Sequence, residues 1–179
     1  MNNMFVRTKR FKNNEYAYLV ENKWTKKGTR QKAVKYLGKV IIPELKKGMD
    51  KEMTVFFDIS KIKKTKSYRE ALKAVLSYVV GCFKFNKKDN VSINITKHKV
   101  FCDGKNCALK LKDGFFCEYT LKRLFNLHYV GQEKLEFGYK LAEGFLICGI
   151  SLDKELFVEI CNKAFNEYED KITFKKLAK

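Results

Sequence analysis

The chain of 179 residues is 45% hydrophobic and carries a formal net charge of +18. This length and this hydrophobic content exclude a fully disordered polypeptide and allow one or two domains with a hydrophobic core. The strong excess of Lys and Arg indicates a polyanionic partner. No apolar run approaches the roughly 18 residues of a membrane-spanning helix, so we expect no membrane partner.

The positive charge is concentrated in the first part of the chain. Residues 1–112 contain 28 Lys and Arg against 9 Asp and Glu, a balance of +19, whereas residues 113–179 balance at −1. We therefore expect residues 1–112 to bind a polyanion. Residues 113–179 are expected to pack within the fold or to pair with another chain. The basic N-terminus is unlike a secretory signal, and the six cysteines are expected to be reduced thiols in a cytoplasmic protein.

Three extended segments open the chain. Residues 5–11, 15–21 and 30–37 are rich in aromatic and β-branched side chains, with a turn at 12–14 and a longer loop at 22–29 between them. Asn-Asn and Gly between such runs are typical of hairpins, so the sequence predicts a three-stranded antiparallel meander that ends at Gly38. The single tryptophan, Trp24, is expected in the longer loop.

Alternation along these strands predicts two unlike faces. Small aliphatic side chains are expected to face the core, and Tyr, Arg and Lys the other way, a combination that stacks on bases and neutralises phosphates. On the third strand Arg30, Lys32, Val34 and Tyr36 are expected to share this second face. The residues expected to bind nucleic acid are Arg7, Lys9, Arg10, Tyr16, Tyr18, Trp24, Lys26, Lys27, Arg30, Lys32, Lys35 and Tyr36. The alternative is that the tyrosines only cover the sheet and the lysines are solvated.

The same segment resembles a known family. Phe5-Val6-Arg7, the run from Tyr16 to Glu21, Gly28 and the run from Arg30 to Lys39 are similar to the N-terminal segment of some insertion-sequence transposases of the Asp-Asp-Glu type. In that family the segment belongs to a DNA-binding region ahead of the catalytic core. The resemblance covers about thirty-five residues and includes no catalytic motif. It implies contact with nucleic acid by Arg7, Arg30, Lys32 and Lys35, and it does not imply transposition.

The central region is predicted to combine a small sheet with one amphipathic helix. Pro43 is expected to begin a helical turn at 44–47, and residues 53–59 have the composition of a buried strand. Ser67 and Glu70 have the spacing of a capping box, which opens a helix with an apolar stripe to Phe83. Further strands are expected at 91–95, 99–102 and 108–111, with a tight turn at 103–104 and the end of the sheet at 113–114.

Three helices are predicted for the C-terminal part. They are expected at 116–127, at 132–148 before Gly149, and after Ser151 as an N-terminal cap. The sequence therefore predicts an α+β protein with a basic β-meander at 1–42, a central α+β region at 43–112 and a helical region at 113–179. Gly138 and Ala142 allow close helix approach, which indicates either core packing or a homodimer through these helices.

Candidate catalytic and metal-binding residues are few. Cys102, Cys107, Cys117 and His128 offer a loosely spaced alternative for zinc, but structural thiols are favoured, and no metal or cofactor is expected. Asp58 is the carboxylate of residues 1–112 that suggests a metal-dependent nuclease, but the sequence identifies no partner for it. The predicted function is non-enzymatic binding of nucleic acid, with DNA favoured over RNA. The alternatives are a metal-dependent nuclease or other nucleic-acid enzyme, and a basic scaffold that binds an acidic protein.

Overall fold

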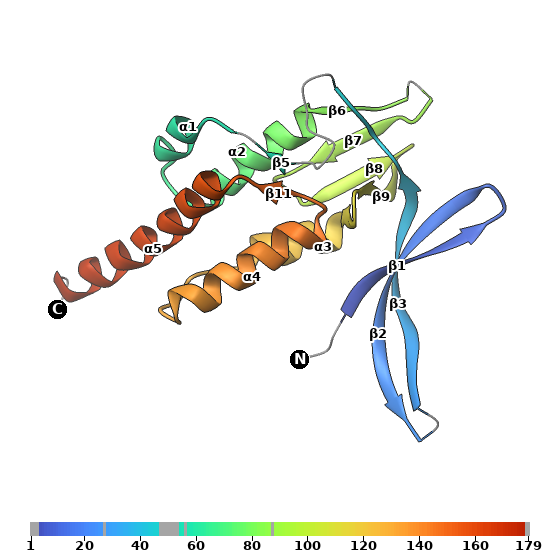
Figure 1. The fold of residues 1–179 in the computed structure, drawn as a ribbon, viewed down its shortest axis with the longest axis horizontal. Helices are drawn as coiled ribbons and strands as arrows, with labels where there is room; N and C mark the ends of the chain where they lie inside the picture. The colour runs from blue at the N-terminus through green and yellow to red at the C-terminus, as the bar shows by residue number, and fades with distance from the viewer. Residues whose placement is uncertain (1–3, 27, 47–53, 56, 87, 178–179) are drawn as a thin grey trace.

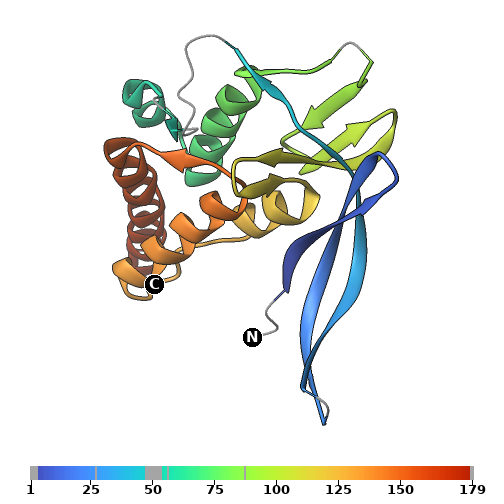
Figure 2. The ribbon, with the colours of Figure 1, turned by 45° about the vertical axis from the view of Figure 1, so that its right-hand side comes forward.

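The computed structural model describes residues 4–26, 28–46, 54–55, 57–86 and 88–177. These residues form an α+β fold, as the sequence predicts. Its main sheet has seven strands in the order β1-β2-β3-β9-β8-β7, with β10 paired to β9. The ribbon formed by β2 and β3 projects beyond the rest of the molecule, while the helices gather away from it (Figure 1, Figure 2).

The N-terminal meander consists of β1 (Met4–Phe11), β2 (Asn14–Thr25) and β3 (Gly28–Ile41). Both pairings are antiparallel, as predicted, but β2 and β3 are longer than expected. Trp24 lies within β2 opposite Thr29, so the prediction of a loop at 22–29 is wrong. The chain instead reverses tightly between Thr25 and Gly28, where the positive φ of Gly28, 100°, suits a sharp turn.

Gly38 does not end the third strand. Its φ is 114°, and a Cβ added there would lie 1.8 Å from the carbonyl oxygen of Asn106. The glycine thus permits a close approach between β3 and β9 (Lys105–Leu111), and residues 39–41 of β3 pair in parallel with β9. The predicted strand end is therefore a crossing point that joins the meander to the body of the molecule.

The remaining predicted strands are present. They are β7 (Val91–Asn94), β8 (Lys99–Cys102) and β9, and the turn between β8 and β9 has positive φ at Asp103 and Gly104, as a type I′ turn requires. The sheet does not end at residues 113–114, because β10 (Gly114–Phe116) folds back against β9.

The segment between β3 and α2 differs from the prediction. Instead of a helical turn, β4 (Glu44–Leu45) pairs with β6 (Phe83–Lys84), and β5 (Thr54–Val55) pairs in parallel with β11 (Ser151–Leu152). The expected strand at 53–59 falls partly outside the described residues, and its last residue already belongs to α1 (Ile59–Lys63). Partner strands that are distant in sequence decide these short pairings, so local propensity does not reveal them.

The helices are α2 (Tyr68–Gly81), α3 (Glu118–Phe125), α4 (Lys134–Ile147) and α5 (Lys154–Leu177). Ser67 caps α2 as predicted, since its hydroxyl accepts the N–H of Glu70 at 3.2 Å. Ser151 does not cap α5, because it lies in β11. The carboxylate of Asp153 accepts the N–H groups of Glu155 and Leu156 instead, at 3.1 and 3.4 Å.

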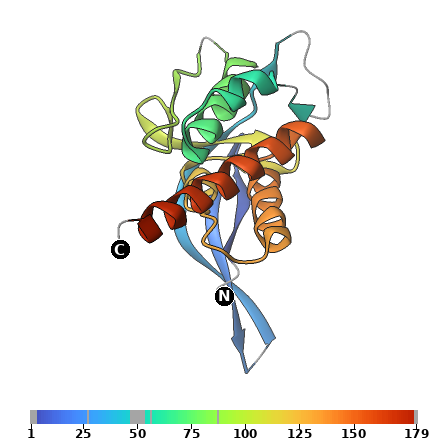
Figure 3. The same cartoon turned by 90° about the vertical axis from the view of Figure 1, so that its left-hand side faces the viewer.

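Two hydrophobic clusters hold these elements together. The larger cluster joins α1–α5 to β8, β9 and β10, and it contains Leu76, Leu109, Phe116, Leu121, Phe125, Phe137, Phe145 and Ile160. The smaller cluster joins Ala17, Leu19, Leu37 and Val40 of the meander to Ala108 and Cys117, with Phe115 and Tyr119 packed against it. One face of the meander therefore rests on β9, β10 and α3, while the tip of the ribbon extends past them (Figure 2, Figure 3).

Candidate nucleic-acid interface

Two β-bulges in β3 decide which side chains share a face of the meander. Ala17 pairs with Gly38 and Tyr18 with Tyr36, which leaves Leu37 as an extra residue. Leu19 pairs with Lys35 and Val20 with Ala33, which leaves Val34 as a second extra residue. Because an extra residue resets the alternation of a strand, side chains on either side of Val34 do not follow the simple two-residue period.

We call the side of the meander that carries the tyrosines the outer face. Residues directly opposite one another in antiparallel strands share a face, so Arg7 lies beside Tyr18 and Lys9 beside Tyr16. The guanidinium of Arg7 donates a hydrogen bond to the Gln31 side chain across β2. The outer face consists of Phe5, Arg7, Lys9, Phe11, Asn14, Tyr16, Tyr18, Val20, Asn22, Trp24, Thr29, Gln31, Ala33, Tyr36 and Lys39.

Tyr36 is the centre of an aromatic cluster on the outer face. Its ring centroid lies 5.4 Å from that of Tyr18 and 6.3 Å from that of Tyr16, and both pairs are tilted. Burial and the neighbouring phenols of Tyr16 and Tyr18 raise the pKa of Tyr36, so its hydroxyl remains a hydrogen-bond donor at neutral pH. The cluster thus offers ring faces for stacking together with phenolic donors.

The outer face is exposed and hollowed. Trp24 is 83% exposed, Phe11 65% and Tyr36 51%, which is unusual for large aromatic side chains. Two hollows of about 310 and 480 Å³ lie on this face, and Lys9 and Tyr18 line both of them. Neighbouring hollows with shared walls of Tyr, Arg and Lys form one continuous surface, and such exposed aromatic surface is typical of a binding site.

The structure separates several predicted site residues from the tyrosines. Arg30 and Lys32 lie opposite Lys23 and Glu21 of β2, and Lys35 lies opposite Leu19, so these three cations are on the inner face that also carries the core residues. The prediction that Arg30, Lys32 and Tyr36 share a face is therefore wrong, and the bulge at Val34 is the cause. Arg10 is opposite Glu15 in the strand register, but it lines the hollow of about 480 Å³ together with Tyr16, Tyr18 and Tyr36, so it stays beside the tyrosines. Lys26 follows the end of β2, and Lys27 lies outside the described residues.

Glu118 gathers three lysines: Lys35, which the sequence predicts as a site residue, and Lys99 and Lys122, which it does not. Its carboxylate lies 2.7 Å from the ammonium group of Lys122, 2.9 Å from that of Lys99 and 3.3 Å from that of Lys35. Burial, which leaves the side chain 8% exposed, favours the neutral acid, but the hydrogen bonds from the three lysines lower the pKa of Glu118 to about 2. In the sequence, the four-residue spacing to Lys122 is the single local sign of this cluster.

His98 extends this basic region toward α2. It has a positive φ of 54° in the turn before β8, and its ring lies 4.5 Å from that of Phe125. Burial lowers the pKa of His98, and the positive charges of Arg69, Lys122 and Lys73 lower it further. The positive charges of α2 and α3 therefore act on the imidazole of His98, which precedes Lys99 in the chain.

The candidate residues for metal chemistry do not come together. Asp58 is exposed, and its carboxylate caps α1 by accepting the N–H of Ser60 at 2.9 Å. Cys102 is opposite Lys105 rather than Cys107, and burial raises the pKa of Cys107 to about 12, which keeps that thiol protonated. Within the described part of the chain, no three His, Cys, Asp or Glu side chains form a group that could hold a metal ion.

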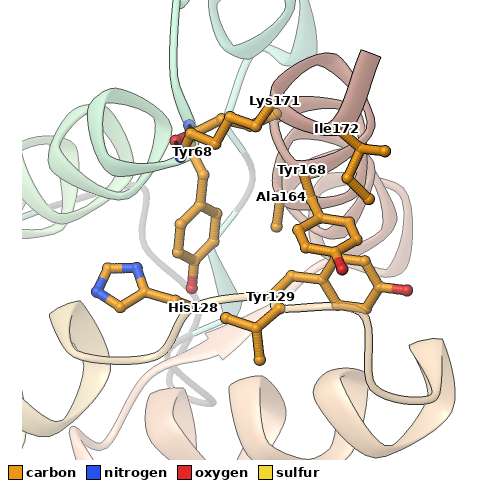
Figure 4. Close-up of a pocket in the computed structure, with 9 residues that line it drawn as sticks. Tyr68, His128, Tyr129, Ala164, Tyr168, Lys171 and Ile172 are labelled. Carbon is orange, nitrogen blue, oxygen red and sulfur yellow. Dashed lines mark hydrogen bonds and ion pairs between the residues drawn. The ribbon is translucent and has the colours of Figure 1, made fainter. Parts of the chain in front are cut away.

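His128 lies elsewhere, at a cavity of about 470 Å³ between the start of α2, the loop before α4 and α5. Figure 4 shows it there with Tyr68, Tyr129, Tyr168 and Lys171. The hydroxyl of Tyr68 is buried without a hydrogen-bond partner among the described residues, and burial raises the pKa of Tyr68 well above its usual value. The residues that line this cavity come from three distant parts of the sequence, so no local motif predicts it.

Among the described residues, no helix combines the length and the apolar character that crossing a membrane requires. Comparison of the chain with protein-family models, with curated proteins and with solved structures finds no match.

Proposed function

We propose that this protein binds nucleic acid without enzymatic activity and that its outer face takes unpaired bases. The observation that carries the proposal is the exposed aromatic cluster around Tyr36, with Arg7 and Lys9 on the neighbouring strand. Stacking of a base on an aromatic ring contributes about 1–3 kcal/mol and tolerates any base. Arg and Lys beside the rings neutralise the phosphates that accompany the bases.

The charge of the outer face supports this function. Both acidic residues of the meander, Glu15 and Glu21, lie opposite inner-face positions, so the described charged residues of the outer face are all cations. A polyanion therefore meets no repulsive carboxylate there. The resemblance of residues 5–39 to the DNA-binding segment of transposases favours DNA over RNA.

The alternative functions have less support. A nuclease that uses metal ions needs carboxylates gathered around those ions, and Asp58 serves as a helix cap instead. A scaffold for an acidic protein would use the lysines but would leave the exposed rings of Trp24 and Phe11 unexplained. Binding of unpaired bases accounts for the rings and the charges together.

Two further expectations belong to the same proposal. Six free thiols, five of them buried, are compatible with a cytoplasmic protein. A homodimer through α4 is supported by the exposure of Leu135, Tyr139 and Leu146, which recur at helical spacing, and by the open space beside Gly138. The molecular mass in solution, measured by light scattering, would show one chain or two.

The test replaces two rings of the cluster, as Tyr18→Leu with Tyr36→Leu. We expect binding of a fluorescent single-stranded oligonucleotide to weaken by about 1–3 kcal/mol per lost stacking contact, with little change in its dependence on salt. The matched control, Tyr78→Leu with Tyr139→Leu, removes two exposed tyrosines from α2 and α4. Equal weakening by both pairs, at unchanged thermal stability, would refute a specific role for the outer face.

A further inference from the structure

We propose that the protein has a second nucleic-acid surface, on the opposite side of β3, which binds a phosphodiester backbone without reading bases. We call it the cationic track, and it consists of Arg30, Lys32, Lys35, Lys99, Lys122, Arg69 and Lys73. The cationic track is a surface separate from the outer face. Its assignment to nucleic acid rests on the function proposed above.

The track extends over four elements, β3, β8, α3 and α2. Arg30, Lys32 and Lys35 follow one another along the inner face of β3, from near the turn between Thr25 and Gly28 toward the body of the molecule. The ammonium group of Lys35 meets those of Lys99 and Lys122 at the single carboxylate of Glu118. Beside Lys99, His98 brings in Arg69 and Lys73 of α2, whose charges act on its imidazole.

The charge of the track exceeds that of the acids beside it, Glu118 and Glu21, of which Glu21 is opposite Lys32 and pairs with Lys23 at 3.2 Å. Glu118 is one carboxylate against three lysines, and Lys35 and Lys122 remain 51% and 50% exposed. Two positive charges of this cluster are therefore uncompensated and open to solvent. The carboxylate fixes the positions of the three ammonium groups, so an arriving phosphate meets preorganised donors.

The length of the track indicates a polymer rather than a small anion. Residues 30–35 of β3 alone extend over roughly 16 Å at the rise of a β-strand. A single phosphate occupies one end of such a surface, whereas a polynucleotide places a charge along its full length. The described aromatic residues of the ribbon, including Trp24 and Tyr36, are on the outer face, so the part of the track on β3 offers cations and no aromatic rings of the ribbon.

The two surfaces define a substrate class. Because they lie on opposite faces of β3, one segment of nucleic acid cannot cover both. Unpaired bases suit the outer face, while a duplex, which hides its bases and displays its phosphates, suits the track. The favoured ligand is therefore a duplex with a single-stranded extension, held by the track and the outer face at once.

The experiment uses two pairs of variants from opposite ends of the track, Arg30→Gln with Lys32→Gln and Arg69→Gln with Lys73→Gln. The control, Lys63→Gln with Lys64→Gln, removes two charges at the C-terminal end of α1, which packs on α5 away from the ribbon (Figure 1). The probes are blunt duplex DNA and a base-free deoxyribose-phosphate oligomer. We expect each track pair to weaken both complexes about tenfold and to lower the slope of log affinity against log salt by up to about two, while the control changes neither.

The outcomes separate the two surfaces. If all three charge pairs weaken duplex binding equally, or if the full protein binds the single strand but neither base-free oligomer nor duplex, the track is refuted and the outer face stands. If the track pairs act as expected and the Tyr18/Tyr36 pair has no effect on single strands, the track stands and the outer face is refuted. A duplex with a single-stranded extension should bind more tightly than either part alone, and equal affinity would contradict joint binding.

Discussion

Glu118 connects three elements through a single side chain. Lys35 reaches it from β3, Lys99 from β8 and Lys122 from its own helix. A buried carboxylate is costly without partners, and here its partners also anchor the meander to the body. The same residue therefore contributes both to the stability of the fold and to the position of the lysines that the cationic track uses.

This arrangement predicts a pH dependence of stability. The pKa of Glu118 is lowered from its ordinary value of 4.5 to about 2, so the folded state binds its proton less readily than the unfolded state. The stabilisation is therefore complete above about pH 4.5 and is lost as the pH falls toward 2. Glu118→Gln should lower the free energy of unfolding at neutral pH by about 1–3 kcal/mol and should reduce the acid dependence measured by chemical denaturation.

The control for this prediction is Glu143→Gln. Glu143 is an exposed carboxylate that pairs with Arg123 at 2.6 Å, and such surface pairs contribute about 0–1 kcal/mol. If the two variants lost equal stability at neutral pH, Glu118 would be an ordinary surface carboxylate.

At the scale of elements, β3 is the strand in which the sequence fails to predict which face each side chain occupies. Its bulge at Val34 places Arg30 and Lys32 on the face opposite to Tyr36, although simple alternation predicts the reverse. A bulge adds one residue without a distinctive composition, so a pattern of period two cannot locate it. Gly38 was a visible signal, but it permits a close approach of two backbones rather than a strand end.

The close approach at Gly38 predicts unequal effects of two matched substitutions. Gly38→Ala should destabilise the protein by about 3 kcal/mol or more, because the new methyl group meets the backbone of Asn106 and the backbone has a positive φ. Gly28→Ala shares the positive φ but meets nothing within 4 Å, so we expect a loss of about 1–2 kcal/mol. Urea denaturation checks both, and equal losses would show that the contact with Asn106 is unimportant.

Other elements also differ in whether the local sequence predicts them. The stripe of α2 with its Ser67 cap and the turn at Asp103 and Gly104 were predictable, because these signals are local. The pairings of β4 with β6 and of β5 with β11 were not, because short strands gain stability from distant partners. For the site, the tyrosines and their neighbours Arg7 and Lys9 were predicted, whereas the lysine cluster at Glu118 depends on tertiary contacts.

At the scale of the whole molecule, the meander and the C-terminal part depend on one another. Leu19, Leu37 and Val40 are buried against a cluster that includes Cys117, with Phe115 and Tyr119 packed on it. The sequence suggests that residues 1–112 could keep their nucleic-acid contacts alone if they stayed folded. The structure indicates that this piece would expose apolar surface of its own, because α3, α4 and α5 provide much of the core.

We therefore expect a protein ending at residue 112 to lose cooperative thermal unfolding and to associate. Removal of the helices uncovers buried residues of both hydrophobic clusters, and exposed apolar surface drives aggregation. Circular dichroism melting and sedimentation check this outcome. A monomeric fragment that melts cooperatively would show that residues 1–112 fold independently.

The parallel pairing of β3 with β9 has a consequence for the protein during its synthesis. Residues 39–41 of β3 cannot pair until residues 107–109 of β9 have been synthesised. The edge of β3 is therefore unpaired while the intervening chain is made. An unpaired strand edge is a template for association between nascent chains. Residues 4–41 contain 11 Lys and Arg against 2 Asp and Glu, and mutual repulsion between two such segments opposes this association. The positive charge of residues 4–41 is therefore expected to oppose association between nascent chains, whatever the folded protein binds.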